Sequence, residues 1–220
     1  MSKKTVHRVV VVDDHPIMRQ GLCALIAAEP DLSVCGEAES AESAMEVVPR
    51  EKPDLVIADI TLPGRNGIEL IKDLHSVVPE IPVLVLSMHD EAIYAERVLR
   101  VGGRGYVMKQ EGGLKLMEAI RKVLSGQVYV SESTSARILE SMAGGGRREE
   151  VSSVSSLTDR ELEVFEMFGK GLGTREIAQK LHLSVKTVEV HRSNIKRKLG
   201  LDTANALVRY AVRWVESEGD

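Results

Sequence analysis

Three aspartates in the first half of the chain have the spacing of a metal site. Asp13 and Asp14 directly follow the apolar run Val9–Val12. Asp59 follows a second run, Leu55–Ala58, in the same way. If these runs are neighbouring parallel strands, three carboxylates meet at one edge of a sheet and repel each other unless a divalent cation is present. Oxygen ligands with room for water suit Mg2+ or Mn2+ rather than zinc, so the spacing predicts a magnesium or manganese site.

A hydroxyl and an ammonium group follow two later apolar runs. Ser87 comes directly after Val83–Leu86, and Lys109 comes shortly after Gly105–Val107. Carboxylates, a hard metal, a hydroxyl and a lysine together suit the in-line transfer of a phosphoryl group. The metal and Lys109 would neutralise the phosphoryl oxygens, and Ser87 would bind one of them. Asp59 is the expected nucleophile, because it faces the adjacent pair of aspartates alone.

The elements that must position these residues alternate along the chain up to about residue 126. The four runs named above and a fifth, Leu32–Cys35, predict β-strands, and four of the five are nearly continuous apolar stretches. Such stretches are typical of parallel strands buried on both faces. A final helix is predicted by apolar residues at helical spacing: Leu114, Met117, Ile120 and Leu124. The pattern predicts an α/β domain with a (βα)5 doubly wound parallel sheet, whose functional groups lie at the carboxyl ends of the strands.

This half of the chain resembles the receiver domain of two-component response regulators, from about residue 7 to residue 126. The resemblance lies in five features: the pair Asp13-Asp14, Asp59 within Asp-Ile-Thr-Leu-Pro-Gly-Arg-Asn-Gly, Ser87, Tyr106 and Lys109. It implies that Asp59 accepts a phosphoryl group from a partner histidine kinase. It also implies that Asp14, Asp59 and the backbone carbonyl of Thr61 bind the Mg2+ (or Mn2+), while Asp13 acts largely through water.

The resemblance further implies a switch pair. The Ser87 hydroxyl would move toward the phosphoryl group, and the ring of Tyr106 would rotate inward. His89, two residues after Ser87, is expected to be a loop residue rather than a metal ligand. His15 is expected to be a turn residue rather than a phosphodonor.

Two enzyme classes are disfavoured by motifs that the sequence lacks. A haloacid-dehalogenase-like phosphatase also uses a strand-end aspartate with Mg2+, but it needs Asp-x-Asp around its nucleophile, which neither Asp13 nor Asp59 provides. The GxxxxGK[ST] loop of nucleoside triphosphatases is missing too. We therefore expect no enzyme activity beyond self-phosphotransfer to Asp59 and slow autodephosphorylation. A regulator that works without phosphorylation, or a receiver that acts as a phosphate sink, stays open as an alternative.

Composition divides the chain into two domains. Near Ser141 the sequence becomes rich in glycine and serine with mixed charge, as in flexible linkers. We predict a receiver domain over residues 1–130, a linker over 131–156 and a second domain over 157–220. The second domain opens with Thr158 and Glu161, which are spaced as a capping box. Further helix boundaries are indicated at Gly171, Thr174, Ser184, Gly200 and Thr203. Four short helices fit these boundaries, so this domain is expected to be all-α.

The helix expected from Ser184 to about Leu199 has two distinct faces. At about 100° per residue, Ile195 and Leu199 lie within about 20° of Val188 and form an apolar stripe. The opposite face carries small and basic side chains: Lys186, Val190, Ser193 and Arg197. Such a face suits a DNA major groove, with basic side chains reaching the phosphates. A short turn joins the preceding helix, about residues 175–181, as a helix-turn-helix requires.

The second domain resembles the LuxR-type helix-turn-helix domain of the NarL/FixJ subfamily over nearly its whole length. The matching motifs are Leu157-Thr158-x-x-Glu161, Gly171, Glu176-Ile177-Ala178, Ser184-x-x-Thr187-Val188-x-x-His191 and Lys198-Leu199-Gly200. The resemblance implies binding to double-stranded promoter DNA and control of transcription. It implies that Glu189, Val190 and Ser193 meet base edges. Phosphates would be met by five further residues: Lys186, Thr187, Arg192, Lys196 and Arg197.

The last helix, about residues 204–215, carries an apolar stripe made of Leu207, Val208, Ala211 and Val215, with Trp214 near its end. Packing in the domain core explains most of this stripe. The resemblance implies that the same helix also makes a dimer contact on DNA. A homodimer is therefore expected when the protein is phosphorylated or bound to DNA.

Charge and composition are compatible with this interpretation. The formal net charge is -4. Residues 180–198, however, hold six lysines and arginines and a single acidic residue, Glu189, so this segment is locally basic. No apolar run approaches the ~20 residues that span a bilayer, and the N-terminal region turns acidic too early for a signal peptide. We expect a cytoplasmic protein without a membrane partner. Cys23 and Cys35 lie in no ligand pattern and are expected to be buried free thiols.

Overall fold

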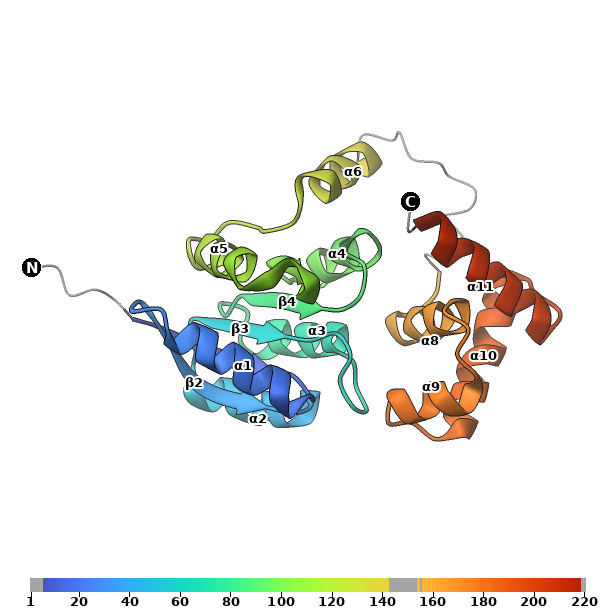
Figure 1. Cartoon of the computed structure of the whole chain (residues 1–220), viewed down its shortest axis with the longest axis horizontal. Coiled ribbons are helices and arrows are strands. Elements are labelled where there is room, and N and C mark those ends of the chain that lie inside the picture. The colour runs from blue at the N-terminus through green and yellow to red at the C-terminus, as the bar shows by residue number, and fades with distance from the viewer. Residues whose placement is uncertain (1–5, 143–153, 155, 219–220) are drawn as a thin grey trace, which may run out of the picture. The chain divides into compact units, whose positions relative to one another are not determined.

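Five parallel strands form the sheet that the apolar runs predict (Figure 1). Their order is β2-β1-β3-β4-β5, so the chain winds outward in both directions from β1 and β3. The strands are β1 (His7–Val12), β2 (Leu32–Ala38), β3 (Leu55–Ala58), β4 (Val83–Ser87) and β5 (Gly105–Met108). The predicted doubly wound α/β fold is confirmed.

The computed structural model describes residues 6–142, 154 and 156–218. The chain divides into two compact units, Met1–Leu139 and Glu140–Asp220. Among the described residues, no helix combines the length and the apolar character that crossing a bilayer requires.

Helices cover both faces of the sheet. In chain order they are α1 (Pro16–Ala27), α2 (Ala41–Glu51), α3 (Gly67–Val77), α4 (Glu91–Arg100) and α5 (Gly112–Leu124). One core cluster joins α1 and α5 to the strands, with Leu22, Ile26, Leu116 and Ile120 among its members. On the other face α2 contacts α3, and α3 contacts α4. At the carboxyl ends of the strands, loops connect each strand to the helix that follows it.

The apolar face of α5 differs from the predicted stripe. The helix predicted from the spacing of Leu114, Met117, Ile120 and Leu124 is present, but Leu114 is 91% exposed and lies off its buried face. The residues that face the sheet are Leu116, Met117, Ala119, Ile120 and Val123. Leu114 lies two residues from Leu116, about 200° around the helix, so both cannot face the sheet. Leu116 reaches the core because it is centred among the other buried positions.

The chain after α5 continues along the sheet and then forms a helix. The amide of Tyr106 donates to the carbonyl of Tyr129 at 2.8 Å, and the amide of Tyr129 donates to the carbonyl of Arg104 at 3.0 Å. This segment covers the outer edge of β5. Helix α6 (Glu132–Met142) follows. It lies within residues 131–156, where composition predicts a linker, whereas most of the rest of that range lies outside the described residues.

The two cysteines are free thiols, as expected, but they are only partly buried. Cys23 lies on α1 and Cys35 lies on β2. Partial burial is the main cause that raises the pKa of each thiol. Neither therefore has the lowered thiol pKa of a reactive cysteine.

Within the described residues 156–218, the structure has the four predicted helices: α8 (Asp159–Gly169), α9 (Thr174–Lys180), α10 (Val185–Leu199) and α11 (Ala204–Glu218). Their ends carry the predicted caps. The Ser184 hydroxyl accepts from the Thr187 amide at 3.0 Å. After α10, Gly200 adopts a left-handed conformation with φ of 65°, which glycine tolerates best.

Aromatic packing joins α8 to α11. The ring of Phe165 lies 5.5 Å from Trp214 and 5.9 Å from Tyr210, measured between centroids. Leu207 and Ala211 are fully buried. Val208, which the apolar stripe had included, is 36% exposed, because it lies 100° around the helix from Leu207.

The capping box of α8 provides a stability prediction. The Thr158 hydroxyl accepts from the Glu161 amide at 3.3 Å, and the Glu161 carboxylate accepts from the Thr158 amide at 2.9 Å. We expect Thr158→Ala to destabilise the second domain by about 1 kcal/mol, because an amide at the helix start loses its partner. Trp214 is the single tryptophan and lies on α11, so its fluorescence during urea unfolding reports on this domain. Thr158→Ser should retain the stability, and a loss equal to that of the alanine variant would contradict the capping explanation.

Candidate functional site

Hydrogen bonds between neighbouring strands bring the predicted acidic residues to one edge of the sheet. The amide of Asp59 donates to the carbonyl of Val12 at 3.0 Å, and the amide of Asp13 donates to the carbonyl of Ala38 at 3.1 Å. Ser87 is the last residue of β4, which pairs with β3. The carboxyl ends of these parallel strands therefore form one acidic mouth, as the sequence predicts.

A glycine fixes the loop that follows Asp59. A Cβ atom on Gly67 would lie 2.0 Å from the carbonyl oxygen of Asp59, so no other residue fits there without moving the backbone. The Gly67 amide donates to the carbonyl of Ile60 at 2.8 Å. The side chain of Asn66 begins α3 by accepting from the Glu69 amide at 3.0 Å. The loop is thus held against the strand that carries Asp59.

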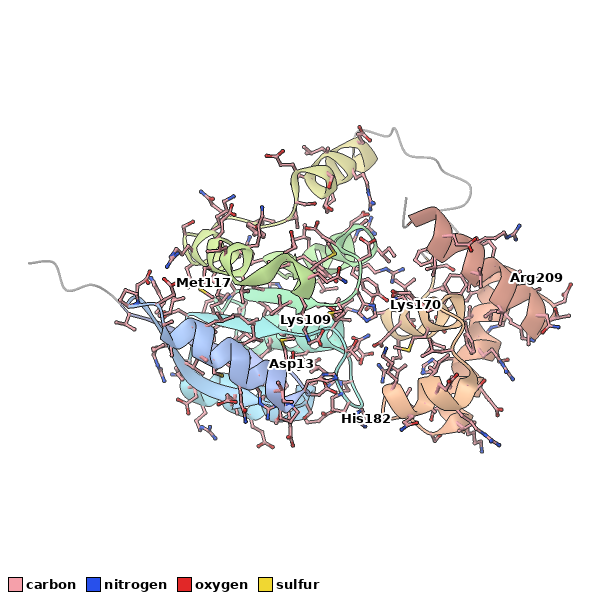
Figure 2. All side chains as sticks on the ribbon, viewed as in Figure 1. Asp13, Lys109, Met117, Lys170, His182 and Arg209 are labelled. Atoms are coloured by element: carbon pink, nitrogen blue, oxygen red, sulfur yellow. The ribbon has the colours of Figure 1, made fainter. Side chains whose placement is uncertain are left out.

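Lys109 connects the carboxylates across the mouth. Its Nζ donates to Oδ2 of Asp13 at 2.7 Å and to Oδ2 of Asp59 at 2.6 Å. Figure 2 labels Asp13 and Lys109 among the side chains of the first unit. All three side chains are at least nine-tenths buried. Burial by itself lowers the pKa of Lys109, but the two carboxylates outweigh it and raise that pKa. Burial raises the pKa of Asp59, against the opposite effect of Lys109.

The donor set fits a hard divalent cation. Ligand atoms of Asp13, Asp14, His15 and Asp59 all lie within 4.8 Å of one another. Three carboxylates against one lysine leave the mouth negatively charged, which a magnesium or manganese ion would balance. His15 begins α1, and its Nδ1 lies 2.6 Å from Oδ1 of Asp14. His15 was expected to be a turn residue, and the structure adds that its side chain contacts the carboxylate cluster through Asp14.

The predicted switch residues lie beside the mouth. Ser87 is fully buried and Tyr106 is 1% exposed, with its ring turned into the protein. The Tyr106 hydroxyl donates to the backbone carbonyl of His89 at 2.9 Å. The His89 amide lies 3.4 Å from the Ser87 hydroxyl. The start of the loop after β4 is thus bonded to both residues of the predicted switch.

His89 is the residue whose importance sequence reasoning missed. Its Nε2 lies 3.0 Å from Oγ1 of Thr61, and its ring lies 4.7 Å from that of Tyr94. The side chain is buried although it was expected only to occupy a loop. The sequence feature that could have indicated its burial is its position two residues after Ser87. In an extended segment every second side chain points to the same side, so His89 can follow Ser87 toward the interior. The Thr61 amide donates to Oδ1 of Asp59 at 3.3 Å, which links His89 to the acidic mouth.

In the second unit, α10 presents the predicted exposed face. Val188 and Ile195 are fully buried, whereas Leu199 is partly buried. The side chains on the outer face are exposed: Lys186, Glu189, Val190, Ser193 and Arg197. Three others are half-buried: Thr187, Arg192 and Lys196. The face has the mixed small and basic character that suits a DNA groove.

Several of these side chains bond to the helix-turn-helix itself. The Thr187 hydroxyl lies 2.8 Å from that of Ser184 at the start of α10. Arg192 donates to the Thr174 hydroxyl on α9 at 3.4 Å. Lys198 donates to the Glu161 carboxylate at 2.5 Å, so it joins α10 to α8 instead of extending the basic face.

Comparisons with known proteins agree with both halves of the structure. Residues 9–121 match the response regulator receiver domain, and residues 155–211 match the bacterial regulatory proteins of the luxR family. The oxygen regulatory protein NreC of Staphylococcus epidermidis is 33% identical over 211 residues, which cover 94% of this chain and 97% of NreC.

Solved structures show the same similarity. RcsB of Salmonella enterica serovar Typhimurium, bound to promoter rprA with the phosphomimetic BeF3-, is 30% identical with a TM-score of 0.63. That match covers 94% of this chain and 99% of the RcsB chain. A LuxR-family two-component response regulator from Aurantimonas is 32% identical with a TM-score of 0.59, over 63% of this chain and 99% of that one.

Proposed function

Because this chain belongs to the response regulators that join a receiver domain to a luxR-family DNA-binding domain, we propose that phosphoryl transfer to Asp59 controls its transcriptional activity. The observation that carries this proposal is the contact of Lys109 with both Asp13 and Asp59 at the strand ends. A histidine kinase is the proposed phosphodonor. The domain boundaries at residues 130 and 157 and the cytoplasmic location stay predictions from the sequence.

The residues of the mouth would each have a role in the transfer. An Oδ atom of Asp59 attacks phosphorus, forming an O–P bond, while the P–N bond to the kinase histidine breaks and the imidazole leaves. Lys109, already 2.6 Å from Asp59, would shift to a phosphoryl oxygen and stabilise its charge. The Ser87 hydroxyl would donate to another. Bound Mg2+ would neutralise charge on the phosphoryl oxygens. We assign its protein ligands to Asp14, Asp59 and the Thr61 carbonyl, with Asp13 acting through water.

The metal assignment predicts the effect of one substitution. Asp14→Asn should weaken Mg2+ binding about tenfold or more, since a neutral amide replaces an anionic ligand. Isothermal titration calorimetry with MgCl2 measures this. Asp54 provides the matched control, because it lies before β3, at the end of the strand opposite Asp59, and accepts from the Arg8 amide. If Asp14→Asn and Asp54→Asn bound Mg2+ equally well, Asp14 would not be a ligand.

For DNA, we propose that α10 enters the major groove of promoter DNA. Glu189, Val190 and Ser193 would meet base edges, with Glu189 accepting from a cytosine amine and Val190 contacting a thymine methyl. The basic and hydroxyl side chains around them would meet phosphates: Lys186, Thr187, Arg192, Lys196 and Arg197. A homodimer would place two copies of α10 on successive half-sites, and the exposed Val208 on α11 supports a contact through that helix.

The test treats the full chain with acetyl phosphate and Mg2+. Intact mass measures phosphoryl uptake, and the same samples are assayed for dimerisation and DNA binding. The DNA is a duplex selected by the treated protein from a random-sequence pool. We expect uptake of one phosphoryl group together with tighter dimerisation or DNA binding. DNA binding without any phosphoryl uptake would instead favour a phosphorylation-independent regulator, and uptake without any change in DNA binding would favour a phosphate sink.

A further inference from the structure

A buried carboxylate attaches helix α6 to the receiver domain. Glu91, the first residue of α4, is 7% exposed. Its Oε1 accepts from the Ser131 amide at 2.7 Å, and its Oε2 accepts from the Thr134 hydroxyl at 3.1 Å. Burying a carboxylate is costly unless hydrogen bonds replace its water. One of these bonds comes from Ser131, the residue just before α6, and the other from Thr134 in the first turn of that helix, so the position of α6 is coupled to the start of α4.

The start of α6 is built to meet this carboxylate. The Ser131 hydroxyl caps the helix by accepting from the Thr134 amide at 3.2 Å, which turns the Thr134 hydroxyl toward Glu91. A negative charge at a helix N-terminus is also favoured by the helix dipole. One turn further along α6, the Arg137 guanidinium donates to the carbonyl of Ala92. Both contacts lie on the first turn of α4.

The loop residue His89, just before α4, is bonded to both predicted switch residues, Ser87 and Tyr106. Glu91 lies two residues after His89, whose carbonyl accepts from the Tyr106 hydroxyl at 2.9 Å. The ring that makes this bond is turned inward and is 1% exposed. On its other side, the amide of Tyr106 donates to the carbonyl of Tyr129 at 2.8 Å, two residues before Ser131. Glu91 and Ser131, which bond to each other, thus each lie two residues after a residue whose carbonyl accepts a hydrogen bond from Tyr106.

We propose that Glu91 is the positioning residue through which phosphorylation orders helix α6, the segment that leads to the DNA-binding domain. When the Tyr106 ring turns inward, its hydroxyl fixes the His89 carbonyl and hence the start of α4. Glu91 is then placed to bind the first turn of α6. When the ring turns outward, this bond is lost and α6 detaches. The inference rests on the proposed phosphorylation of Asp59, and it supplies the two-state element that coupling requires.

Hydrogen exchange on the full chain tests this inference, with BeF3- and Mg2+ as the phosphomimetic probe. In the wild type, we expect BeF3- to slow exchange of the α6 amides by about tenfold, the order expected from one charge-assisted hydrogen bond. In Glu91→Ala, BeF3- should no longer slow exchange of the α6 amides, and it should leave the DNA affinity nearly unchanged. The variant should still take up a phosphoryl group from acetyl phosphate, because Glu91 is not part of the acidic mouth.

Two further variants make the test specific. Glu96→Ala removes a carboxylate from the same helix, where it pairs with Arg100 at the surface, and should behave as the wild type. Thr134→Val removes one donor to Glu91 at nearly constant size and should reduce the slowing in part, which keeps the test usable if Glu91→Ala fails to fold.

The outcomes separate this inference from the proposed function. If BeF3- raised DNA affinity while exchange in α6 stayed unchanged, or if Glu91→Ala kept the full response, the role of Glu91 would be disproved and the proposed function would stand. If BeF3- changed neither quantity in the wild type, phosphorylation control itself would fail, and the inference with it.

Discussion

Replacing Asp59 by asparagine is expected to abolish phosphoryl uptake from acetyl phosphate and Mg2+. The amide has no anionic oxygen to attack phosphorus, and it removes one of the proposed metal ligands. Folding should be retained, because the amide oxygen can still accept from Lys109 and one buried negative charge is removed from beside Asp13. Intact mass should show no phosphorylated species under conditions where the wild type gains one phosphoryl group.

Asp54→Asn is the matched control for this experiment. It makes the same chemical change at the opposite end of β3, where Asp54 is 48% exposed. This variant should gain the phosphoryl group as the wild type does. A phosphorylated Asp59→Asn protein would place the acceptor elsewhere, with Asp13 the nearest carboxylate that shares Lys109. The Asp59 variant should also lose the gain in DNA affinity that acetyl phosphate produces.

The second large effect is expected on DNA binding. The double variant Lys186→Ala and Arg197→Ala removes two exposed cations from α10, one near each end of the helix. Affinity should fall on the order of tenfold to a hundredfold at physiological salt, because phosphate contacts dominate binding through the release of counterions. The slope of log affinity against log salt concentration should shrink by about one for each cation that no longer meets a phosphate. Fluorescence anisotropy over a range of salt concentrations measures both quantities.

A control separates the DNA-binding face from net charge. Arg100→Ala with Lys115→Ala removes the same charge from the receiver surface, where these side chains are 75% and 54% exposed. That protein should bind DNA with the wild-type salt slope. Equal losses in the two double variants would mean that α10 does not face the phosphates. Val190→Ala should behave differently again, with reduced discrimination between sequences and an unchanged salt slope, because a base contact carries no counterions.

Much of this protein could be predicted from local sequence patterns. The apolar runs predicted the five strands, because strands covered on both faces need no polar alternation. Aspartates directly after two such runs predicted the acidic mouth, since parallel strands end at the same edge of a sheet. In the second half, Thr158 and Ser184 predicted helix starts that the structure confirms, because capping depends on residues only three positions apart.

Other features depended on interactions between distant parts of the chain. Periodicity included Leu114 and Val208 among the apolar residues of their helices, but only the packing of neighbouring elements decided that both side chains stay exposed. The role of His89 became visible only when the fold brought it to Thr61, 28 residues away. Glu91 and the first turn of α6 are more than 40 residues apart, and the composition of residues 131–156 gave no sign of a helix held by a carboxylate.

The sequence by itself determined the elements, their caps and the kinds of chemical group at the strand ends, because neighbours a few residues apart fix these. The tertiary structure alone decided which groups meet. Lys109 reaches Asp59 across 50 residues and Asp13 across 96. No local pattern encodes such a meeting of side chains. It arises because the order of strands in the sheet and the burial of its core bring the ends of β1, β3 and β5 together.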